Sequence, residues 1–548
     1  MEDEEDASSK QSHTFETALE AVGTLGPWQA LVALQAGFVI WVSASVVKAS
    51  QYYQVTPSYH CKVPGGFPAS WSTEQRVEIS SPSSIPCEYY PLNYTDLPSD
   101  FGEASRAADR LRNETEPLKC MDWNFDTSSS GIGTTSVSEY KLVCDNRLGF
   151  EHSQSMHFVG FVLGNVVGGP LADRYGRRPV ILGMSMLTIV TSLPLPFSPN
   201  YWLFALGRAA NSFSFFASAL LYSFAMEWAS AKYRTAAAGL LWIPYAVGSV
   251  AISGVAYLIR DWRYMHTVAS LPLLLTLFFW CFLAESPRWL LAKGRIDEAR
   301  RVLEWAARWN GRRLPDHLDL DEIARETQAD VKQTETLLHV FKFSRMRPRY
   351  PLLFMWALVL FLNWILVNLA YYGFVFNISN YEGNRYLNNA LADLSEVVAY
   401  LVVPLMMMLG RKVTIIGNFC VAACALVLIP WIPREGVLLW LSTACIVVGK
   451  FCVTNAFTAI VTVTTEVYPT VIRSSGYAAS SAVGRVGSSV GPYINAIGKF
   501  EPSLHWATET TFAGASLLAA SSVALLPETK NAELPASLED AERSFRKD

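Results

Sequence analysis

The sequence predicts an all-α membrane protein with twelve transmembrane helices, arranged as two pseudo-symmetric six-helix bundles with a large extracellular loop between helices 1 and 2. Three observations support this fold class. The chain of 548 residues is 51% hydrophobic and 17% charged, whereas soluble domains contain about 25% charged residues. Apolar stretches close to the roughly 20 residues needed to cross a bilayer recur along the chain. Short motifs of the first half also return in the second half.

Twelve apolar windows are expected to span the membrane: Ala30–Val47, Ser153–Leu171, Val180–Leu195, Tyr201–Met226, Ala236–Leu258, His266–Ala284, Tyr350–Asn377, Asn389–Leu409, Val413–Trp431, Val437–Val461, Ser474–Ile497 and Thr511–Leu526. Short cytoplasmic loops carry an excess of Lys and Arg, so the basic segments 173–178, 231–235, 287–295 and 410–412 mark the cytoplasmic side. Both termini are then cytoplasmic. RDWR (260–263) is the exception, because it carries two arginines on the outside.

The loop at 55–150 is expected outside the cell. It contains two glycosylation acceptors, Asn93-Tyr-Thr95 and Asn113-Glu-Thr115. An even number of cysteines on an oxidising face indicates two disulfides, with three possible connectivities. The four cysteines are Cys61, Cys87, Cys120 and Cys144.

The two halves of the chain repeat one another. GRRPVILG (176–183) resembles GRKVTIIG (410–417), and charged residues that follow equivalent spans recur 239 to 243 positions later. They are Glu227 and Arg234 with Glu466 and Arg473, and Glu285 with Glu528. Two similar six-helix bundles with a cavity between them are typical of alternating-access transporters.

These observations predict five regions. They are a cytoplasmic N-terminus (1–27), a first bundle (28–284) that includes the glycosylated loop, a cytoplasmic linker (285–349), a second bundle (350–527) and a cytoplasmic C-terminus (528–548). The linker contains amphipathic stretches that either rest under the bundles or serve as a simple connection.

Several motifs together resemble the organic cation, anion and zwitterion (carnitine) transporter family of the major facilitator superfamily. They are GGPLADRYGRRP (168–179), IRDWR (259–263), ESPRWLLAKGRIDEA (285–299), EVYPTVIRSSG (466–476), LPETK (526–530) and the external pattern CMDWNFD…SEYKLVCD (120–145). Two features depart from the family pattern. Cation transporters of the family often have six loop cysteines rather than four, and Val398 replaces the proline usual after the glutamate of span eight.

Charges at the cytoplasmic helix ends are expected to open and close the carrier. A carboxylate there can pair with an arginine or with a helix N-terminus when the bundles close, and separate when they part. Glu227 with Arg234, and Glu466 with Arg473, are the expected pairs. The alternative is that these charges only fix the topology. The gating residues are Asp173, Arg177, Arg178, Glu227, Arg234, Glu285, Arg288, Arg411, Glu466, Arg473 and Glu528.

Arg485 lies about twelve residues into span eleven, too deep to reach water by snorkelling. A charge at that depth costs about 2.5–3.5 kcal/mol on insertion scales, so a partner, a wet cavity or a ligand must compensate. Family members that carry anions or zwitterions have arginine here, whereas typical cation transporters have aspartate. The resemblance therefore implies that Arg485 docks a substrate carboxylate or comparable anion.

Glu396 in span eight allows two interpretations. It either forms a structural salt bridge with Arg485, or the two charges hold opposite ends of a zwitterion. Aromatic side chains attract cationic groups and stack against planar substrates, so they can select either kind of compound. The expected substrate-contacting aromatics are Tyr371, Tyr372, Tyr222 and Trp364.

The resemblance implies a multi-pass plasma-membrane carrier of small organic anions or zwitterions (carnitine-like or amino-acid-like). The alternatives are an organic cation carrier with Glu396 as counter-ion, a sugar porter and a non-transporting surface receptor. No catalytic constellation, metal site, cofactor motif or nucleic-acid-binding pattern is present in the sequence. The expected partners are a small organic ion and the lipid bilayer, with a monomer sufficient for transport. Sodium or a counter-transported organic anion remains open as a coupling ion.

Overall fold

A computed structural model describes residues 15–63, 66–68, 70–81, 86–126, 133–315, 318–333, 343–344, 347–348, 350–378, 384–433, 438–500, 502–530, 535 and 537–544. The chain forms two compact units. A helical unit comprises Met1–Ala49, Glu151–Leu258 and His266–Asp548, and a smaller loop unit comprises Ser50–Phe150 with Ile259–Met265.

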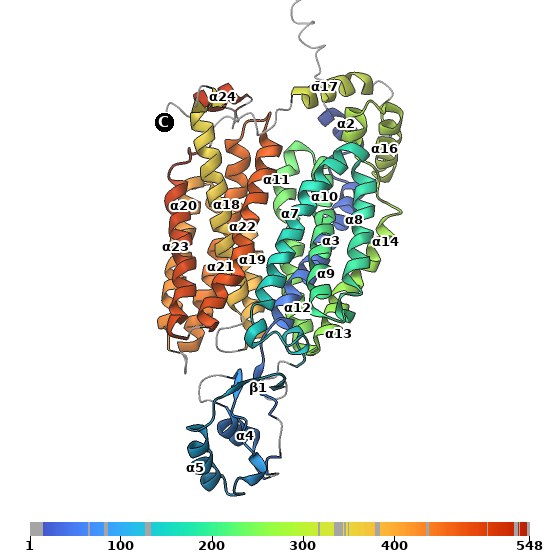
Figure 1. The fold of residues 1–548 in the computed structure, drawn as a ribbon. Coiled ribbons are helices and arrows are strands. Elements are labelled where there is room, and N and C mark those ends of the chain that lie inside the picture. The colour runs from blue at the N-terminus through green and yellow to red at the C-terminus, as the bar shows by residue number, and fades with distance from the viewer. Residues whose placement is uncertain are drawn as a thin grey trace, which may run out of the picture. The chain divides into compact units, whose positions relative to one another are not determined.

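The helical unit contains two groups of helices, coloured blue to green and yellow to red (Figure 1). The first bundle consists of α3 (Pro27–Tyr53), α7 (Gly149–Tyr175), α8 (Arg177–Ser192), α9 (Tyr201–Ser214), α10 (Phe216–Glu227), α11 (Ala231–Leu240), α12 (Ile243–Leu258), α13 (Trp262–Ser270) and α14 (Thr276–Phe279). The second bundle consists of α18 (Pro351–Asn377), α19 (Arg385–Met407), α20 (Arg411–Leu428), α21 (Leu439–Val467), α22 (Arg473–Phe500) and α23 (His505–Val523).

Eight helical segments of the described chain are long and apolar enough to cross a membrane: Pro27–Tyr53, Cys144–Tyr175, Arg177–Phe197, Tyr201–Glu227, Pro351–Phe376, Arg385–Met407, Arg411–Trp431 and Trp440–Val467. The other four expected spans fall on α11 with α12, α13 with α14, α22 and α23. The helices α11 to α14 are each short, although α12 is apolar, whereas α22 and α23 are long but rich in small and polar residues, which lowers their hydropathy. The all-helical fold class is confirmed.

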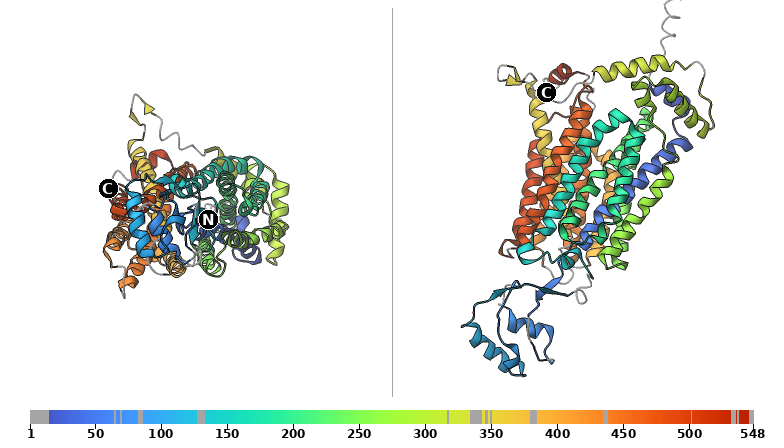
Figure 2. Two further views of the ribbon diagram at one scale, coloured as in Figure 1. Left: turned by 60° about the horizontal axis from the view of Figure 1, so that its bottom comes forward. Right: turned by 45° about the vertical axis from the view of Figure 1, so that its right-hand side comes forward.

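The linker packs against the first bundle instead of serving as a simple connection. Its helices are α15 (Pro287–Ala292), α16 (Ile296–Trp309) and α17 (Leu320–Gln333), and two short strands, β5 (Phe343–Ser344) and β6 (Arg347–Pro348), follow. Leu290, Leu303 and Ile323 are buried in one hydrophobic core with residues of α3, α8 and α10. In the right-hand view of Figure 2, the yellow-green linker helices lie at the upper end of this bundle.

Hydrogen bonds near two short helices stabilise the starts of α3 and α18. Beside α2 (Phe15–Val22), the side chain of Asn310 accepts a hydrogen bond from the backbone N–H of Trp28 at 2.9 Å and donates one to the carbonyl of Val22 at 3.0 Å. In α24 (Leu538–Ser544), Glu542 accepts hydrogen bonds from the backbone N–H groups of Leu352 and Leu353, both at 3.1 Å. Each contact satisfies backbone donors near the start of a spanning helix, α3 or α18.

The loop unit is a small domain with two antiparallel strand pairs. β1 (Ser58–Cys61) pairs with β4 (Trp123–Asp126), and β2 (Glu88–Tyr89) pairs with β3 (Leu118–Lys119). Helices α4 (Thr73–Ser80) and α5 (Phe101–Arg112) enclose a core around Trp71, Ile79 and Tyr94, and α6 (Ser136–Glu139) follows. The side chains of Asn93 and Asn113 are exposed.

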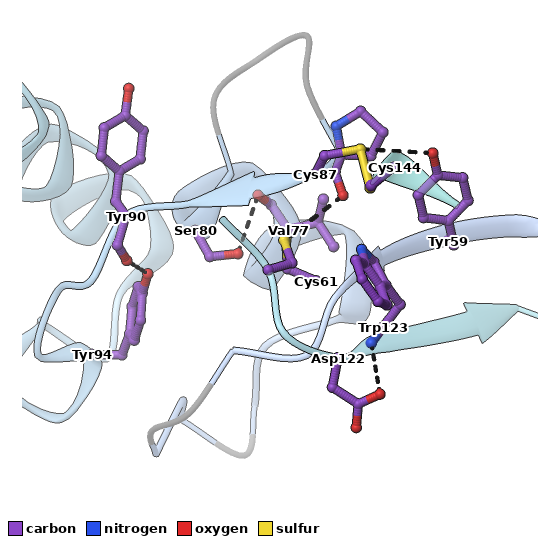
Figure 3. Close-up of a disulfide and its surroundings, with 12 residues drawn as sticks. Tyr59, Cys61, Val77, Ser80, Cys87, Tyr90, Tyr94, Asp122, Trp123 and Cys144 are labelled. Carbon is purple, nitrogen blue, oxygen red and sulfur yellow. Dashed lines mark hydrogen bonds between the residues drawn. A yellow bond between two sulfur atoms is a disulfide. The ribbon is translucent and has the colours of Figure 1, made fainter. Parts of the chain in front are cut away.

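Two disulfides cross-link the loop unit. One links Cys61 to Cys120, and the other links Cys87 to Cys144 (Figure 3). The sequence left three connectivities open, and the structure has the one that pairs the first cysteine with the third and the second with the fourth. The backbone N–H of Cys120 also donates to the carbonyl of Cys87 at 3.0 Å, which brings the two cross-links close together.

The arginines of RDWR are exceptions to the charge rule, and the loop unit gives a reason. Arg263 forms an ion pair with Glu139, whose carboxylate also accepts a 2.6 Å hydrogen bond from the indole N–H of Trp262. Asp261 accepts a 2.6 Å hydrogen bond from Thr134. The charge of Arg263 is thus countered by a carboxylate of the same unit.

Candidate functional site

The turns before α8 and α20 are built in the same way. Gly176 and Gly410 adopt φ values of 105° and 146°, which favour glycine because it lacks a Cβ atom. Glu285 then accepts hydrogen bonds from the first two backbone N–H groups of α8 at 2.8 and 3.2 Å. Glu528 accepts those of α20 at 3.0 and 3.1 Å. Each carboxylate therefore lies at the positive end of a helix.

An arginine at the start of each helix completes the two clusters. In the first bundle, Arg177 lies 3.0 Å from Asp173 and 3.4 Å from Glu227. In the second, Arg411 donates two hydrogen bonds to Glu466, at 3.2 Å from Nε and 2.9 Å from Nη2. We call these the first and second linker-end clusters, and we call this end of the bundles the linker end. The sequence repeat thus places equivalent charges in equivalent positions.

The expected pairing within the second cluster was wrong. Glu466 pairs with Arg411 rather than with Arg473, because Arg411 begins the neighbouring helix beside the end of α21. The guanidinium of Arg473 instead donates to the carbonyl of Tyr468 at 3.2 Å. The side chain of Arg234 lies outside the described part of the structure. Arg178 and Arg288 have exposed side chains, like Asp173.

Arg485 makes no ion pair with any residue that the structure describes. Its guanidinium lies 4.3 Å from the ring centroid of Phe161 on α7 and 3.5 Å from the side-chain oxygen of Asn368 on α18. The same oxygen accepts a 3.1 Å hydrogen bond from Ser488, and Arg485 Nε is buried with no hydrogen-bond partner. Arg485 as a whole residue is partly exposed. A cation in this position keeps donors available for an anion.

Glycines bring α22 close to α18 beside Arg485. A Cβ atom on Gly484 would lie 2.9 Å from the carbonyl oxygen of Trp364, and one on Gly487 would overlap the carbonyl oxygen of Ile365. In the first bundle, a Cβ on Gly248 of α12 would lie 2.5 Å from the carbonyl oxygen of Trp41 on α3. Small residues therefore permit backbone contact at this helix pair in both bundles.

Glu396 belongs to a second, fully buried group of charges. It lies 3.0 Å from Lys450 on α21 and 3.9 Å from Lys48 on α3, and it accepts a 2.7 Å hydrogen bond from the hydroxyl of Tyr371. Asp393, one helical turn away, lies 3.0 Å from Lys48 and also pairs with Lys450. We call Lys48, Asp393, Glu396 and Lys450 the buried quartet. Its formal charges sum to zero.

The buried quartet changes the interpretation of Glu396. The structural salt bridge with Arg485 that the sequence allowed is absent from the described residues, because the lysines occupy the carboxylate. Three members of the quartet, Lys48, Asp393 and Lys450, were missed. Two signals could have revealed them. Lys450 is the lone charge within its apolar window, and Lys48 directly follows the first window; Asp393 precedes Glu396 by three positions, on the same helical face.

The four predicted aromatic residues fall in different surroundings. Tyr371 contacts the buried quartet through Glu396. The ring of Tyr372 packs edge-on against the ring of Tyr371, with centroids 5.2 Å apart. Tyr222 lies beside Trp242 at 5.6 Å. Trp364 is buried and donates to Thr464 at 2.9 Å, which indicates a packing role. Tyr371 is thus bonded to Glu396, a predicted charge.

Several contacts join the two bundles. His152 near the start of α7 bonds to Tyr493 at 2.8 Å, and Ser155 donates to the carbonyl of Ser489 at 2.6 Å. Lys48 forms its ion pairs from α3 to α19. These residues lie toward the end at which α7 and α19 begin, opposite the linker end, and we call it the loop end.

Comparison with known proteins gives matches over almost the whole chain. The family described as "Sugar (and other) transporter" matches residues 130–540. The "Organic cation transporter protein" of Drosophila melanogaster is 29% identical over 97% of this chain and 95% of its own length. "Organic anion transporter 3" of Oryctolagus cuniculus is 28% identical (97% and 94%), and "Solute carrier family 22 member 6" of Mus musculus is 29% identical (97% and 95%).

Solved structures show the same fold. The inward open conformation of the xylose transporter XylE from E. coli has a TM-score of 0.58 and 15% identity, covering 94% of this chain and 98% of that one. XylE bound to 6-bromo-6-deoxy-D-glucose gives a TM-score of 0.57, also at 15% identity. The chain therefore belongs to the sugar (and other) transporter family of the major facilitator superfamily, within its branch of organic cation and anion transporters, solute carrier family 22.

Proposed function

We propose that the protein is a plasma-membrane carrier that moves small organic anions by alternating access, with Arg485 as the docking charge. The observation that carries this proposal is the unpaired guanidinium. Arg485 lies within a spanning helix, has no acidic partner among the described residues and retains a buried Nε–H without an acceptor. A carboxylate that binds there would compensate for the cost of the buried charge.

Zwitterions are the second candidate substrates, and the buried quartet argues against them. A zwitterion with its carboxylate at Arg485 would need a counter-charge for its cationic group, and Glu396 is the carboxylate that the sequence offered. Lys450, Lys48 and Tyr371 already occupy that carboxylate. An organic cation faces the same competition and would also be repelled by Arg485.

The repeated clusters support alternating access. Each linker-end cluster joins the beginning of one helix to the ends of two others, so each can be kept or broken as a bundle moves. The basic segments of the sequence assign the linker end to the cytoplasm. With that assignment, both termini are cytoplasmic, and the contacts at the loop end correspond to a state closed toward the outside.

Uptake into cells tests the proposal. We would measure labelled small dicarboxylates, carnitine and tetraethylammonium in cells that express the wild type, Arg485→Ala, Arg485→Lys or Glu396→Gln. Anion uptake should fall at least tenfold in Arg485→Ala and partly recover in Arg485→Lys, because lysine keeps the charge without the bidentate fork. Val486→Ala is the matched control, since Val486 follows Arg485 on α22 and is 54% exposed.

Surface biotinylation normalises each variant for the amount of carrier. Anion uptake that is unchanged in Arg485→Ala at equal surface level would remove Arg485 from the site. Carnitine uptake that depends on both Arg485 and Glu396 would favour the zwitterion reading. The absence of flux for every compound in the wild type would favour a non-transporting receptor.

A further inference from the structure

The buried quartet is divided between the two bundles. Lys48 lies on α3 of the first bundle, whereas Asp393, Glu396 and Lys450 lie on α19 and α21 of the second. All four side chains are 2% exposed or less. The three residues of the second bundle carry a net charge of −1 by themselves. Lys48 therefore provides the charge that makes the buried group neutral.

The group has the chemistry of a binding site for an alkylammonium ion. The Nζ atoms of Lys48 and Lys450 lie 5.9 and 6.0 Å from the ring centroid of Tyr371, a distance at which a ring face attracts a cation. Asp393 Oδ2 and Glu396 Oε2 are buried without a hydrogen-bond partner. Two carboxylates with free oxygens and an aromatic ring thus surround an ammonium group.

We propose that Lys48 is an internal cation that occupies a latent cation site of the second bundle and thereby excludes organic cations from transport. The site consists of Asp393, Glu396 and Tyr371, and the lysine side chain fills the place of an alkylammonium substrate. Lys48 is then a residue that determines specificity. This inference rests on the proposed transport function and adds the class of compound that is rejected.

Alternating access explains why the exclusion works in a moving protein. Opening the loop end separates α3 from α19 and withdraws Lys48 from the carboxylates. A cation from solution can then enter the site, but closing the loop end returns Lys48. A tethered group competes at an effective concentration in the millimolar range, whereas a substrate is usually more dilute. The cation must leave before closure and is not carried.

The first test replaces the lysine side chain with the corresponding free ion. Lys48→Ala removes three side-chain carbons and the ammonium group, and n-butylammonium supplies an ammonium group on a chain of four carbons. We would follow the thermal unfolding of purified full-length protein in detergent with n-butylammonium chloride, with sodium chloride at equal ionic strength and with butan-1-ol. The melting temperature of Lys48→Ala should rise by a few degrees with n-butylammonium alone, because a ligand that binds the folded state stabilises it.

Three proteins serve as controls in the same measurement. The double variant Lys48→Ala/Asp393→Asn keeps one lysine and one carboxylate, so it remains neutral and should not respond. Lys48→Arg keeps the internal cation and should not respond either, nor should the wild type. An equal rise in all proteins, or a rise with butan-1-ol, would overturn the proposal. So would a folded Lys48→Ala variant that does not respond.

Uptake of labelled tetraethylammonium is the second measurement. The wild type and Lys48→Arg should not exceed mock-transfected cells, whereas Lys48→Ala at equal surface level should exceed them at least fivefold. Tetraethylammonium carried by the wild type overturns the proposal even if Lys48→Ala fails to fold. Failure of the anion-carrier proposal is distinguishable, since it would appear as the loss of Arg485-dependent anion uptake while the n-butylammonium response is unchanged.

Discussion

The linker end and the core of the second bundle use charge in different ways. At the linker end, each half of the chain has the same arrangement of a glycine turn, an arginine and two glutamates. In the core, Arg485 and the residues of the quartet on α19 and α21 belong to the second bundle alone. We expect charges that recur in both halves to serve the motion of the two bundles. We expect charges found in one half to bind or reject a specific ligand.

The largest effect should follow from removing a charge from the core. Lys450→Met leaves Asp393 and Glu396 with Lys48 as their single cation, so a buried charge loses its partner. Breaking a buried pair in this way costs about 3–5 kcal/mol. We expect a large decrease in the free energy of unfolding, measured by denaturation in detergent.

The double variant Lys450→Met/Asp393→Asn restores neutrality and should recover most of that loss. Equal stability of Lys450→Met and the wild type would show that the quartet is not electrostatically coupled, and would weaken the contrast with the linker end.

Matched substitutions at the two linker-end clusters should have smaller and unequal effects. Arg411→Ala removes two hydrogen bonds to Glu466, whereas Arg177→Ala removes one 3.4 Å contact with Glu227 and an exposed one with Asp173. Both arginines are partly exposed, so solvent screens the pairs and the costs should be about 1 kcal/mol or less. Thermal unfolding should show the greater loss for Arg411→Ala. The reverse order would contradict the bidentate geometry.

The smallest expected effect is on stability at low pH, through the carboxylate of Glu528. Burial alone would raise the pKa of Glu528, but the N–H groups of Lys412 and Arg411 outweigh burial and hold that pKa below its ordinary value. The ionised carboxylate therefore contributes stability above the unfolded pKa of about 4.5, and this contribution is lost as the pH falls through the folded pKa.

Glu528→Gln should consequently flatten the loss of stability below about pH 4.5, measured as melting temperature against pH. Glu285→Gln in the first cluster is the matched comparison. Identical pH profiles for Glu528→Gln and the wild type would contradict this assignment.

The sequence was sufficient for the features that are local or repeated. The GRR and GRK motifs, the glutamates after spans six and twelve, and the depth of Arg485 could each be identified from a short stretch of residues. The buried quartet could not be assembled in this way, because Lys48 and its partner Asp393 lie 345 positions apart. Likewise, spacing along the chain suggested Arg473 as the partner of Glu466, whereas helix packing brings Arg411 there.

The contact between α24 and α18 has a practical consequence. Glu542, near the end of the 548-residue sequence, accepts hydrogen bonds from the N–H groups of Leu352 and Leu353 at the start of a spanning helix. A protease site placed upstream of residue 538, or a purification tag that replaces the last helix, would leave those donors without an acceptor. Purification tags should therefore be attached in a way that leaves Leu538–Ser544 intact.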